Sequence, residues 1–207
     1  MKSDYYCSEV LHSYLSMKLG VFENVEDLIE RADKRKMDYH NFKNSKLPRV
    51  EKIIGLLKGI RPPNILDVGF GRGKFLYPFL EEFGNYPITS IELCKSAINE
   101  ATLLETSYNK LKIVETDFLN NDFHDKTFHT LTALEVMEHI EDTVKFLDEC
   151  VRLSYEWIIL SVPSKEDDNP GHIHLFTEEK VNKLFEKYNL KPKYEYVLNH
   201  MIIKVKL

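Results

Sequence analysis

Three glycines at alternate positions follow an apolar segment of the chain. The stretch reads ILDVGFGRGKFL over residues 65–76, with glycines at 69, 71 and 73. Glycine has no Cβ, so the backbone of such a turn can approach a ligand closely, and the N–H groups of a following helix can point at it. The turn therefore predicts a binding loop, either for a phosphate or for the amino-acid end of a larger cofactor.

The spacing of the glycines does not favour a phosphate. A P-loop has the form GxxxxGK followed by Ser or Thr, whereas Lys74 is followed by Phe75. A dinucleotide-binding turn has the form GxGxxG, and here Lys74 stands in place of the final glycine. Both phosphate-binding motifs are therefore disfavoured.

Carboxylate side chains lie at the carboxyl ends of the next two expected strands. Glu92 ends the segment PITSIEL, where its carboxylate could accept hydrogen bonds from both hydroxyls of a ribose. Asp117 and Phe118 end LKIVETDF, and this pair suits an adenine, because the acid can accept from the exocyclic amine while the ring packs on the base. Acids often finish strands, but acids at three consecutive strand ends, with Asp67 the first, favour a nucleoside-containing ligand.

A second group of polar residues lies in ALEVMEHIED. Glu135, Glu138 and His139 have i, i+3, i+4 spacing, so in a helical turn they would share one face and could bind a hard divalent ion. His172 and His174 follow the fifth strand, in a loop expected near the same sheet edge. Alternatively, His139 braces its turn and Glu138 is solvated. The candidates for catalysis are His139, His174 and Glu135, since an oxygen acceptor needs a base or a metal.

The elements that position these residues alternate between strand and helix from Asn64 onward. Expected strands cover residues 64–69, 87–93, 111–118, 128–136 and 156–164, and expected helices cover 73–84, 96–109, 141–154 and 177–189. Such alternation predicts a parallel sheet with helices on both faces. Residues 192–207 can form a hairpin that turns at Asn199-His200 and adds an antiparallel strand. The predicted fold is an α/β, doubly wound, Rossmann-like sheet of seven strands, residues 48–207, with an N-terminal helical cap at 1–47.

The length and composition fit a single domain whose cysteines are reduced thiols. The 207 residues are 43% hydrophobic and carry a formal net charge of −5, which gives no general attraction to nucleic acid. The three cysteines are widely spaced and form no CxxC pair, so neither a zinc site nor a disulfide framework is expected. The chain has no apolar run of membrane-spanning length and no export signal, so we expect a cytoplasmic protein that does not enter a membrane.

The motif DVGFGRG, together with Glu92 and Asp117, resembles the class I S-adenosylmethionine-dependent methyltransferase family over residues 50–207. The resemblance implies that S-adenosyl-L-methionine is the cofactor. It also implies a set of cofactor-binding residues. These are Asp67, Gly69, Phe70, Gly71 and Gly73 for the amino-acid portion, Glu92 for the ribose, Asp117 and Phe118 for the adenine, Leu134 with Glu135 against the methionine, and Leu93 as a further contact. Phe70 departs from the family, in which a small residue is more usual.

The EVMEH segment resembles the ubiquinone-biosynthesis O-methyltransferases and therefore implies a small-molecule acceptor. The pattern of Glu, Glu, His and a later His is also similar to that of small-RNA 3′-terminal 2′-O-methyltransferases, in which a magnesium ion engages the terminal ribose. The segment LFTEEK departs from those enzymes by simply starting a helix. No NPPY-like segment is present, so methylation of a base amine is disfavoured. A module that binds the cofactor without catalysis is a further alternative.

The N-terminal helices are the expected cover of the acceptor. Four tyrosines there could line its pocket, although docking of the cap onto the sheet is the more common role of such side chains; they are Tyr5, Tyr6, Tyr14 and Tyr39.

Overall fold

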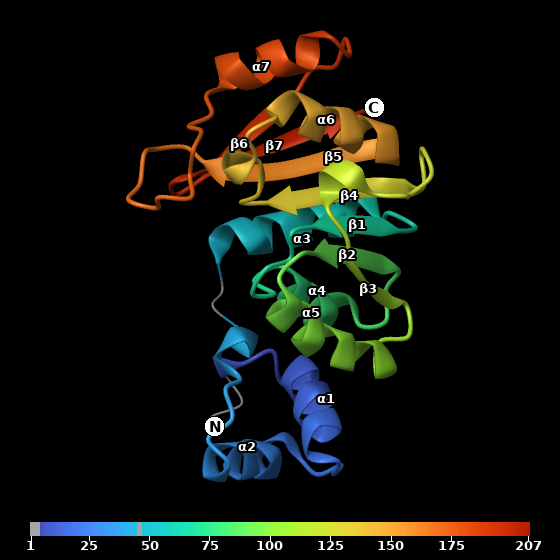
Figure 1. Cartoon of the computed structure of the whole chain (residues 1–207), viewed down its shortest axis with the longest axis vertical. Coiled ribbons are helices and arrows are strands. Elements are labelled where there is room, and N and C mark those ends of the chain that lie inside the picture. Colours follow the sequence, from blue (N-terminus) through green and yellow to red (C-terminus); the bar gives the residue numbers. More distant parts are fainter. Residues whose placement is uncertain (1–4, 45–46) are drawn as a thin grey trace.

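The computed structural model describes residues 5–44 and 47–207, and in it seven strands form one mixed sheet in the order β3-β2-β1-β4-β5-β7-β6 (Figure 1). The strands are β1 (Ile65–Val68), β2 (Ile88–Glu92), β3 (Leu111–Glu115), β4 (Phe128–Leu134), β5 (Ser154–Pro163), β6 (Lys193–Val197) and β7 (His200–Lys206). The first five are parallel, and β7 runs antiparallel to both of its neighbours. The predicted doubly wound α/β sheet with a terminal antiparallel hairpin is confirmed.

The helices cover both faces of this sheet. They are α1 (Ser8–Leu19), α2 (Val25–Lys34), α3 (Pro48–Ile60), α4 (Leu76–Phe83), α5 (Lys95–Thr102), α6 (Thr143–Leu153) and α7 (Glu178–Glu186), with short 3-10 turns η2 (His40–Phe42), η3 (Leu103–Thr106), η4 (Phe118–Asn120) and η5 (Met137–His139). Ile65 of β1 packs in the core shared with α3 and α4, whereas its neighbour Leu66 packs in the core shared with α6 and α7. This alternation follows from the period of two in a strand.

The strand order reverses between β1 and β4, which are neighbours although two strands separate them in the sequence. Val68 at the end of β1 aligns with Ile91 of β2 on one side and Ala133 of β4 on the other. In open parallel sheets, ligands bind beyond the carboxyl ends of the strands at such a reversal. The glycine turn begins at this point.

The N-terminal helices dock through aromatic side chains onto α4. Tyr14 of α1 stacks on Phe42 at 4.6 Å between ring centroids, and Phe42 stacks on Tyr77 of α4 at 4.4 Å. Tyr39 is buried as well, whereas Tyr5 is 74% exposed. The helices α1 and α2 lie at the opposite end of the long axis from β6 and β7 (Figure 1). The division of the chain after residue 47 stays a prediction.

Three local details differ from the sequence-based expectation. The predicted helix over 96–109 is divided, because α5 ends at Thr102 and a 3-10 turn follows it. The terminal hairpin turns at Leu198 and Asn199, one residue earlier than predicted, with Leu198 at a left-handed φ of 53°. Helix α4 begins at Leu76 rather than at the last glycine, so Pro78 lies in its first turn, where a missing N–H is tolerated.

Across the described ranges, no helix is both long and apolar enough to cross a membrane.

Candidate functional site

The three glycines of the turn all adopt left-handed backbone conformations, with φ of 69° at Gly69, 51° at Gly71 and 70° at Gly73. A Cβ on Gly69 would lie 2.9 Å from the Val136 side chain, and a Cβ on Gly73 would collide with the Tyr77 ring. A Cβ on Gly71 would meet no atom closer than 3.9 Å. The outer glycines therefore permit close packing of the turn, while Gly71 leaves open space beside the backbone.

A cavity of about 380 Å³ opens beside this turn. Its walls come from the turn itself, from Asp67 at the end of β1, from Leu134 and Glu135 at the end of β4, from His139, and from Arg49 in the first turn of α3. Five predicted cofactor residues line it, which are Asp67, Gly69, Phe70, Gly71 and Leu134. Helices α1 and α2 contribute none of the residues that line it, so the expected cover of an acceptor by these helices finds no support in the described part of the chain.

Asp67 is a carboxylate buried in the central strand, with only 2% of its surface exposed. Ser90 Oγ donates to it at 3.3 Å, and Thr132 Oγ1 donates at 3.1 Å. Burial raises the pKa of Asp67 to about 7, and the two hydroxyl groups only partly oppose this effect. A cationic ligand group placed near Asp67 would favour the ionised form.

The ring of Phe70, the residue that departs from the family, packs into the core shared with α3 and α4 and is 6% exposed. It also forms part of the cavity wall. The larger side chain is thus accommodated by the core, and it narrows the cavity from one side without filling it.

Glu92 joins the end of β2 to the glycine turn. Its Oε2 accepts from the N–H of Gly71 at 2.8 Å, and its Oε1 accepts from the N–H groups of Leu93 at 2.8 Å and Cys94 at 3.1 Å. A carboxylate oxygen can accept two hydrogen bonds, so Oε2 keeps capacity for one hydroxyl group in this conformation. Leu93 is 60% exposed next to it and offers an apolar surface outside the cavity.

The third strand end departs from expectation at Phe118. The Asp117 carboxylate accepts from the N–H of Leu119 at 2.9 Å and so caps η4. The Phe118 ring is 7% exposed and lies 5.1 Å from the Phe146 ring, in the core beneath α6. A ring buried there does not fit the predicted packing against an adenine, because the chain turns at Asp117 and directs the side chain inward.

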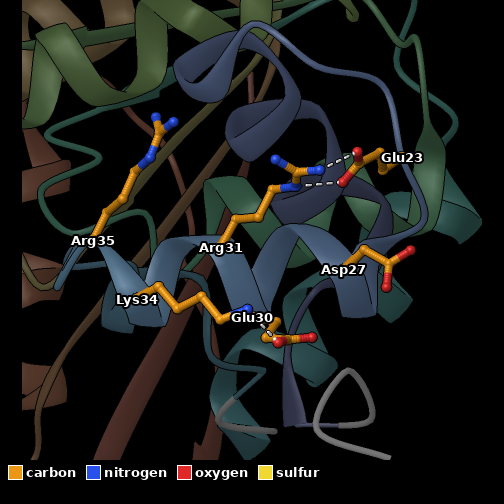
Figure 2. Close-up of a pocket in the computed structure, with 6 residues that line it drawn as sticks. All are labelled: Glu23, Asp27, Glu30, Arg31, Lys34 and Arg35. Carbon is orange, nitrogen blue, oxygen red and sulfur yellow. Dashed lines mark hydrogen bonds and ion pairs between the residues drawn. The ribbon is translucent and has the colours of Figure 1, made fainter.

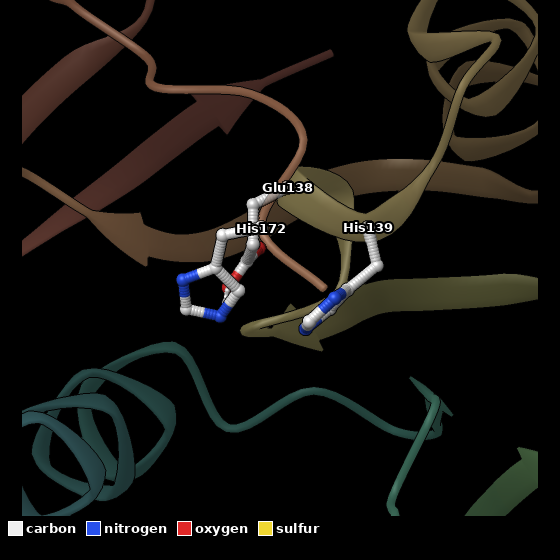
Figure 3. Close-up of side chains that lie close together, drawn as sticks. All are labelled: Glu138, His139 and His172. Atoms are coloured by element: carbon white, nitrogen blue, oxygen red, sulfur yellow. Dashed lines mark ion pairs between the residues drawn. The ribbon is translucent and has the colours of Figure 1, made fainter. Parts of the chain in front are cut away.

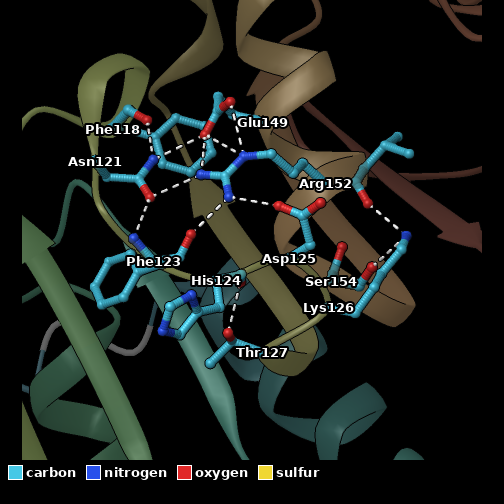
Figure 4. A network of polar contacts seen from close by, with 11 residues as sticks. Phe118, Asn121, Phe123, His124, Asp125, Lys126, Thr127, Glu149, Arg152 and Ser154 are labelled. Carbon is cyan, nitrogen blue, oxygen red and sulfur yellow. Dashed lines mark hydrogen bonds and ion pairs between the residues drawn. The ribbon is translucent and has the colours of Figure 1, made fainter.

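Arg152 of α6 holds the segment that follows η4 (Figure 4). Its guanidinium donates to the Phe123 carbonyl at 2.6 Å and to Asp125 Oδ1 at 2.9 Å. It also donates to Asn121 Oδ1 at 3.0 Å and to Glu149 Oε2 at 2.7 Å. Arg152 is therefore a main tie between this loop and α6, together with Glu149, which accepts from Asn121 Nδ2 at 2.8 Å, and Lys145, which donates to Asn120 Oδ1 at 3.1 Å.

The second polar group is assembled from Glu138, His139 and His172, whose ligand atoms all lie within 4.8 Å of one another (Figure 3). Glu138 is 0% exposed, and neither of its carboxylate oxygens has a hydrogen-bond partner among the described residues. Burial raises the pKa of Glu138 to about 8. A buried acid without a partner is costly, and a cation beside it would remove that cost.

Polar contacts orient both histidine rings, through Nδ1 in His139 and through Nε2 in His172. His139 Nδ1 lies 2.7 Å from the Gly171 carbonyl, to which it donates, so Nε2 carries the lone pair of the neutral ring. His172 Nδ1 lies 2.9 Å from Asp167 Oδ2, while its Nε2 lies 3.9 Å from Glu138 Oε1 and 3.0 Å from Asn169 Nδ2. The Nδ1 contact of His139 is typical of histidines that bind a metal. The donor set of one carboxylate and two imidazoles fits a divalent ion.

Glu135 does not join this group, contrary to the predicted i, i+3, i+4 set. It precedes η5 with a left-handed φ of 58°, so the helical face assumed for the three residues does not form. Its carboxylate accepts from Ser161 Oγ at 2.7 Å and lies 3.0 Å from His200 Nδ1. Glu135 still lines the cavity, whereas His174 does not, and His174 Nε2 lies 3.1 Å from the Ile140 carbonyl.

Sequence reasoning missed Arg49 and His200, because neither lies in a recognisable motif. Arg49 follows the proline that opens α3, and His200 lies 151 positions later, yet their side chains are 3.3 Å apart. An arginine near the start of a helix that precedes the glycine turn was the available signal for Arg49. For His200 the sequence held none.

A separate surface hollow of about 450 Å³ lies along α2 and carries only charged side chains (Figure 2). Arg31 donates to both carboxylate oxygens of Glu23 at 2.7 and 2.6 Å, and Lys34 lies 2.5 Å from Glu30. These ion pairs largely neutralise the hollow, so it offers no concentrated charge to a ligand.

Comparison with known proteins points to a methyltransferase domain. A family model described as a methyltransferase domain matches residues 66–154. A ubiquinone biosynthesis O-methyltransferase of Rickettsia typhi is 31% identical over 109 residues, which cover 48% of this chain and 41% of that protein. The chain thus spans less than half the length of this relative.

Solved structures share the fold. A methyltransferase described as S-adenosylmethionine-dependent from Aquifex aeolicus has a TM-score of 0.63 at 18% identity, over 84% of this chain and 95% of that one. The methyltransferase domain of a bacterial Hen1 protein, CtHen1-C, also has a TM-score of 0.63, at 19% identity, over 77% of this chain and 96% of that one.

Proposed function

Because the chain belongs to the class I S-adenosylmethionine-dependent methyltransferase family, we propose that it transfers a methyl group from S-adenosyl-L-methionine to a small-molecule acceptor. The observation that carries the proposal is the open space at Gly71, between a cavity at the β1–β4 reversal and the carboxylate of Glu92. An acceptor of small size is supported by the similarity to the ubiquinone biosynthesis enzyme.

The cavity pairs a carboxylate with a guanidinium, which suits a zwitterionic amino-acid group. Asp67 and Arg49 line the same cavity and offer opposite charges. In our proposal Asp67 receives the ammonium group of the cofactor, Arg49 its carboxylate, and Glu92 a ribose hydroxyl. Asp117 remains the candidate for the adenine amine, and Leu93 offers an apolar surface for the base in place of Phe118.

When bound, the cofactor supplies a methyl group activated by a sulfonium with a neutral leaving group. The task of the chain is then mainly to orient the two reactants and to exclude water. His139 lies at the cavity wall, with its Nδ1 engaged by Gly171, so its Nε2 could take a proton from a hydroxyl acceptor.

Calorimetric titration with S-adenosylmethionine and S-adenosylhomocysteine tests this proposal. Substitution Glu92→Ala should weaken binding at least tenfold, because the ribose contact and the tie to Gly71 are lost together. Glu115→Ala is the matched control, since Glu115 is an exposed strand-end acid aligned with Glu92 on the next strand. No binding to the unaltered chain at millimolar ligand would refute the proposal. Binding without transfer to any acceptor would favour the non-catalytic module.

The cluster of Glu138, His139 and His172 favours a second candidate, which is metal-assisted methylation of a ribose hydroxyl at an RNA 3′ end. A divalent ion held there would lower the pKa of an acceptor hydroxyl. The bacterial Hen1 domain shares only the fold with this chain. The proposed use of a metal is supported by the donor set of Glu138, His139 and His172. A transfer assay on small RNAs with and without Mn²⁺ tests it, and absence of metal-dependent transfer would exclude it.

A further inference from the structure

Four side chains, from three different elements and the loop after β4, form a polar network at the wall of the cavity. Glu135 follows β4, and its Oε1 accepts from Ser161 Oγ of β5 at 2.7 Å. Its Oε2 lies 3.0 Å from His200 Nδ1 of β7, and Oε1 lies 3.8 Å from Arg49 Nε of α3. Arg49 Nη1 and His200 Nε2 are 3.3 Å apart and complete the network.

Glu135 is held in place by its backbone as well as its side chain. Its φ of 58° is left-handed, a conformation that costs a residue with a Cβ about 1 kcal/mol or more. Its N–H donates to the carbonyl of Ser161 at 2.9 Å, which keeps the strained residue against β5. The result is a carboxylate turned toward Arg49 and His200, and away from Glu138.

His200 reaches the site because the terminal hairpin returns to the carboxyl edge of the sheet. It is the first residue of β7 and aligns with Pro163, the last residue of β5. Its Nδ1 lies 3.0 Å from Glu135 Oε2, a charge contact without hydrogen-bond geometry, and its Nε2 lies 3.3 Å from Arg49 Nη1, where a lone pair on Nε2 can accept from the guanidinium. Only the neutral ring offers a donor and an acceptor together, and burial lowers the pKa of His200, which favours that form.

Arg49 has few other constraints. Its Nε is buried and has no hydrogen-bond partner among the described residues, and its side chain lies in the first turn of α3 directly after Pro48. Glu135 and His200 are the partners that the structure gives its guanidinium. The direction of Arg49 at the cavity wall therefore depends on these two side chains.

We propose that His200 is a positioning residue, which acts with Glu135 to hold the Arg49 guanidinium where it binds the carboxylate of the cofactor. The inference rests on the proposed function, and it makes the terminal hairpin part of the cofactor site. His200 itself need not contact the ligand.

The test compares two ligands on the full chain by calorimetry. S-adenosylhomocysteine carries the amino-acid group, and 5′-methylthioadenosine carries the same nucleoside without it. His200→Ala should weaken the binding of S-adenosylhomocysteine about tenfold, equivalent to about 1.4 kcal/mol, and leave the affinity for 5′-methylthioadenosine unchanged. His200→Asn keeps a donor near the Nδ1 position and should restore part of the loss. His129→Ala, a half-buried histidine of β4, is the matched control.

A second variant keeps the test independent of folding. Arg49→Met alone should weaken the binding of S-adenosylhomocysteine but not that of 5′-methylthioadenosine. When His200→Ala is added to Arg49→Met, the affinity for S-adenosylhomocysteine should fall no further, because the effect of His200 passes through Arg49. Equal weakening of both ligands by His200→Ala, or an additive loss in the Arg49→Met background, would overturn the proposal. If the unaltered chain binds neither ligand, the proposed function fails, and this inference fails with it.

Discussion

The buried carboxyl of Asp67 makes the stability of the protein depend on pH in a defined direction. Its pKa of about 7 lies above the ordinary value of 3.8, so between these values the folded chain holds a proton that the unfolded chain has released. The stabilisation is complete below about pH 4 and is lost as the pH rises through 7. At 1.36 kcal/mol per pH unit, the interval corresponds to about 4 kcal/mol as an upper bound.

Substitution Asp67→Asn should remove this dependence, because a neutral amide of the same size titrates at no pH in this range. Urea unfolding at pH 4.5, 6 and 7.5 measures the effect. Between pH 4.5 and 7.5, the free energy of unfolding of the unaltered chain should fall by about 2 to 4 kcal/mol more than that of Asp67→Asn, which is on the order of the upper bound given above. Asp122→Asn, at an exposed aspartate, is the control and should follow the unaltered chain. Parallel pH profiles for the unaltered chain and Asp67→Asn would refute the reasoning.

Three further predictions concern the glycine turn, the metal cluster and the Arg152 network. Gly73→Ala should destabilise the fold by about 2 kcal/mol or more, because its Cβ meets the Tyr77 ring, whereas Gly71→Ala should cost about 1 kcal/mol in urea unfolding and mainly weaken ligand binding by calorimetry. Glu138→Gln should abolish Mn²⁺ binding measured by calorimetry, and retained Mn²⁺ affinity would contradict the assignment. The stability of Glu138→Gln relative to the unaltered chain should rise between pH 4.5 and about 8, because over this interval the unfolded chain has released a proton that the folded chain still holds. Arg152→Met should lower the free energy of unfolding by about 2 kcal/mol, since its partly buried acceptors lose a charged donor, and an unchanged urea midpoint would contradict this.

The parts of the site that could be predicted from the sequence depend on local backbone rules. A buried strand followed by alternating glycines places the turn at the carboxyl edge of a parallel sheet, and Glu92 follows from the next strand end. The fold follows from the alternation of strand and helix patterns, which is continuous from residue 64. These features need no knowledge of which distant segments meet.

The candidate metal cluster was only partly predictable, because the backbone angle of Glu135 decides which side chains meet. A helical turn would have placed Glu135 beside Glu138, but the left-handed φ of Glu135 turns its side chain toward β5 and β7. The third side chain of the candidate cluster is instead His172, more than thirty residues later in the chain. Phe118 is a similar case, since the direction of a side chain after a strand end depends on how the next turn folds.

The most direct test of the account is the affinity of the unaltered chain and of Glu92→Ala for S-adenosylhomocysteine, measured by calorimetry at neutral pH. The account predicts one site per chain, with binding at least tenfold weaker in Glu92→Ala and unchanged in Glu115→Ala. No binding to the unaltered chain at millimolar ligand, or equal affinity in all three proteins, would contradict it.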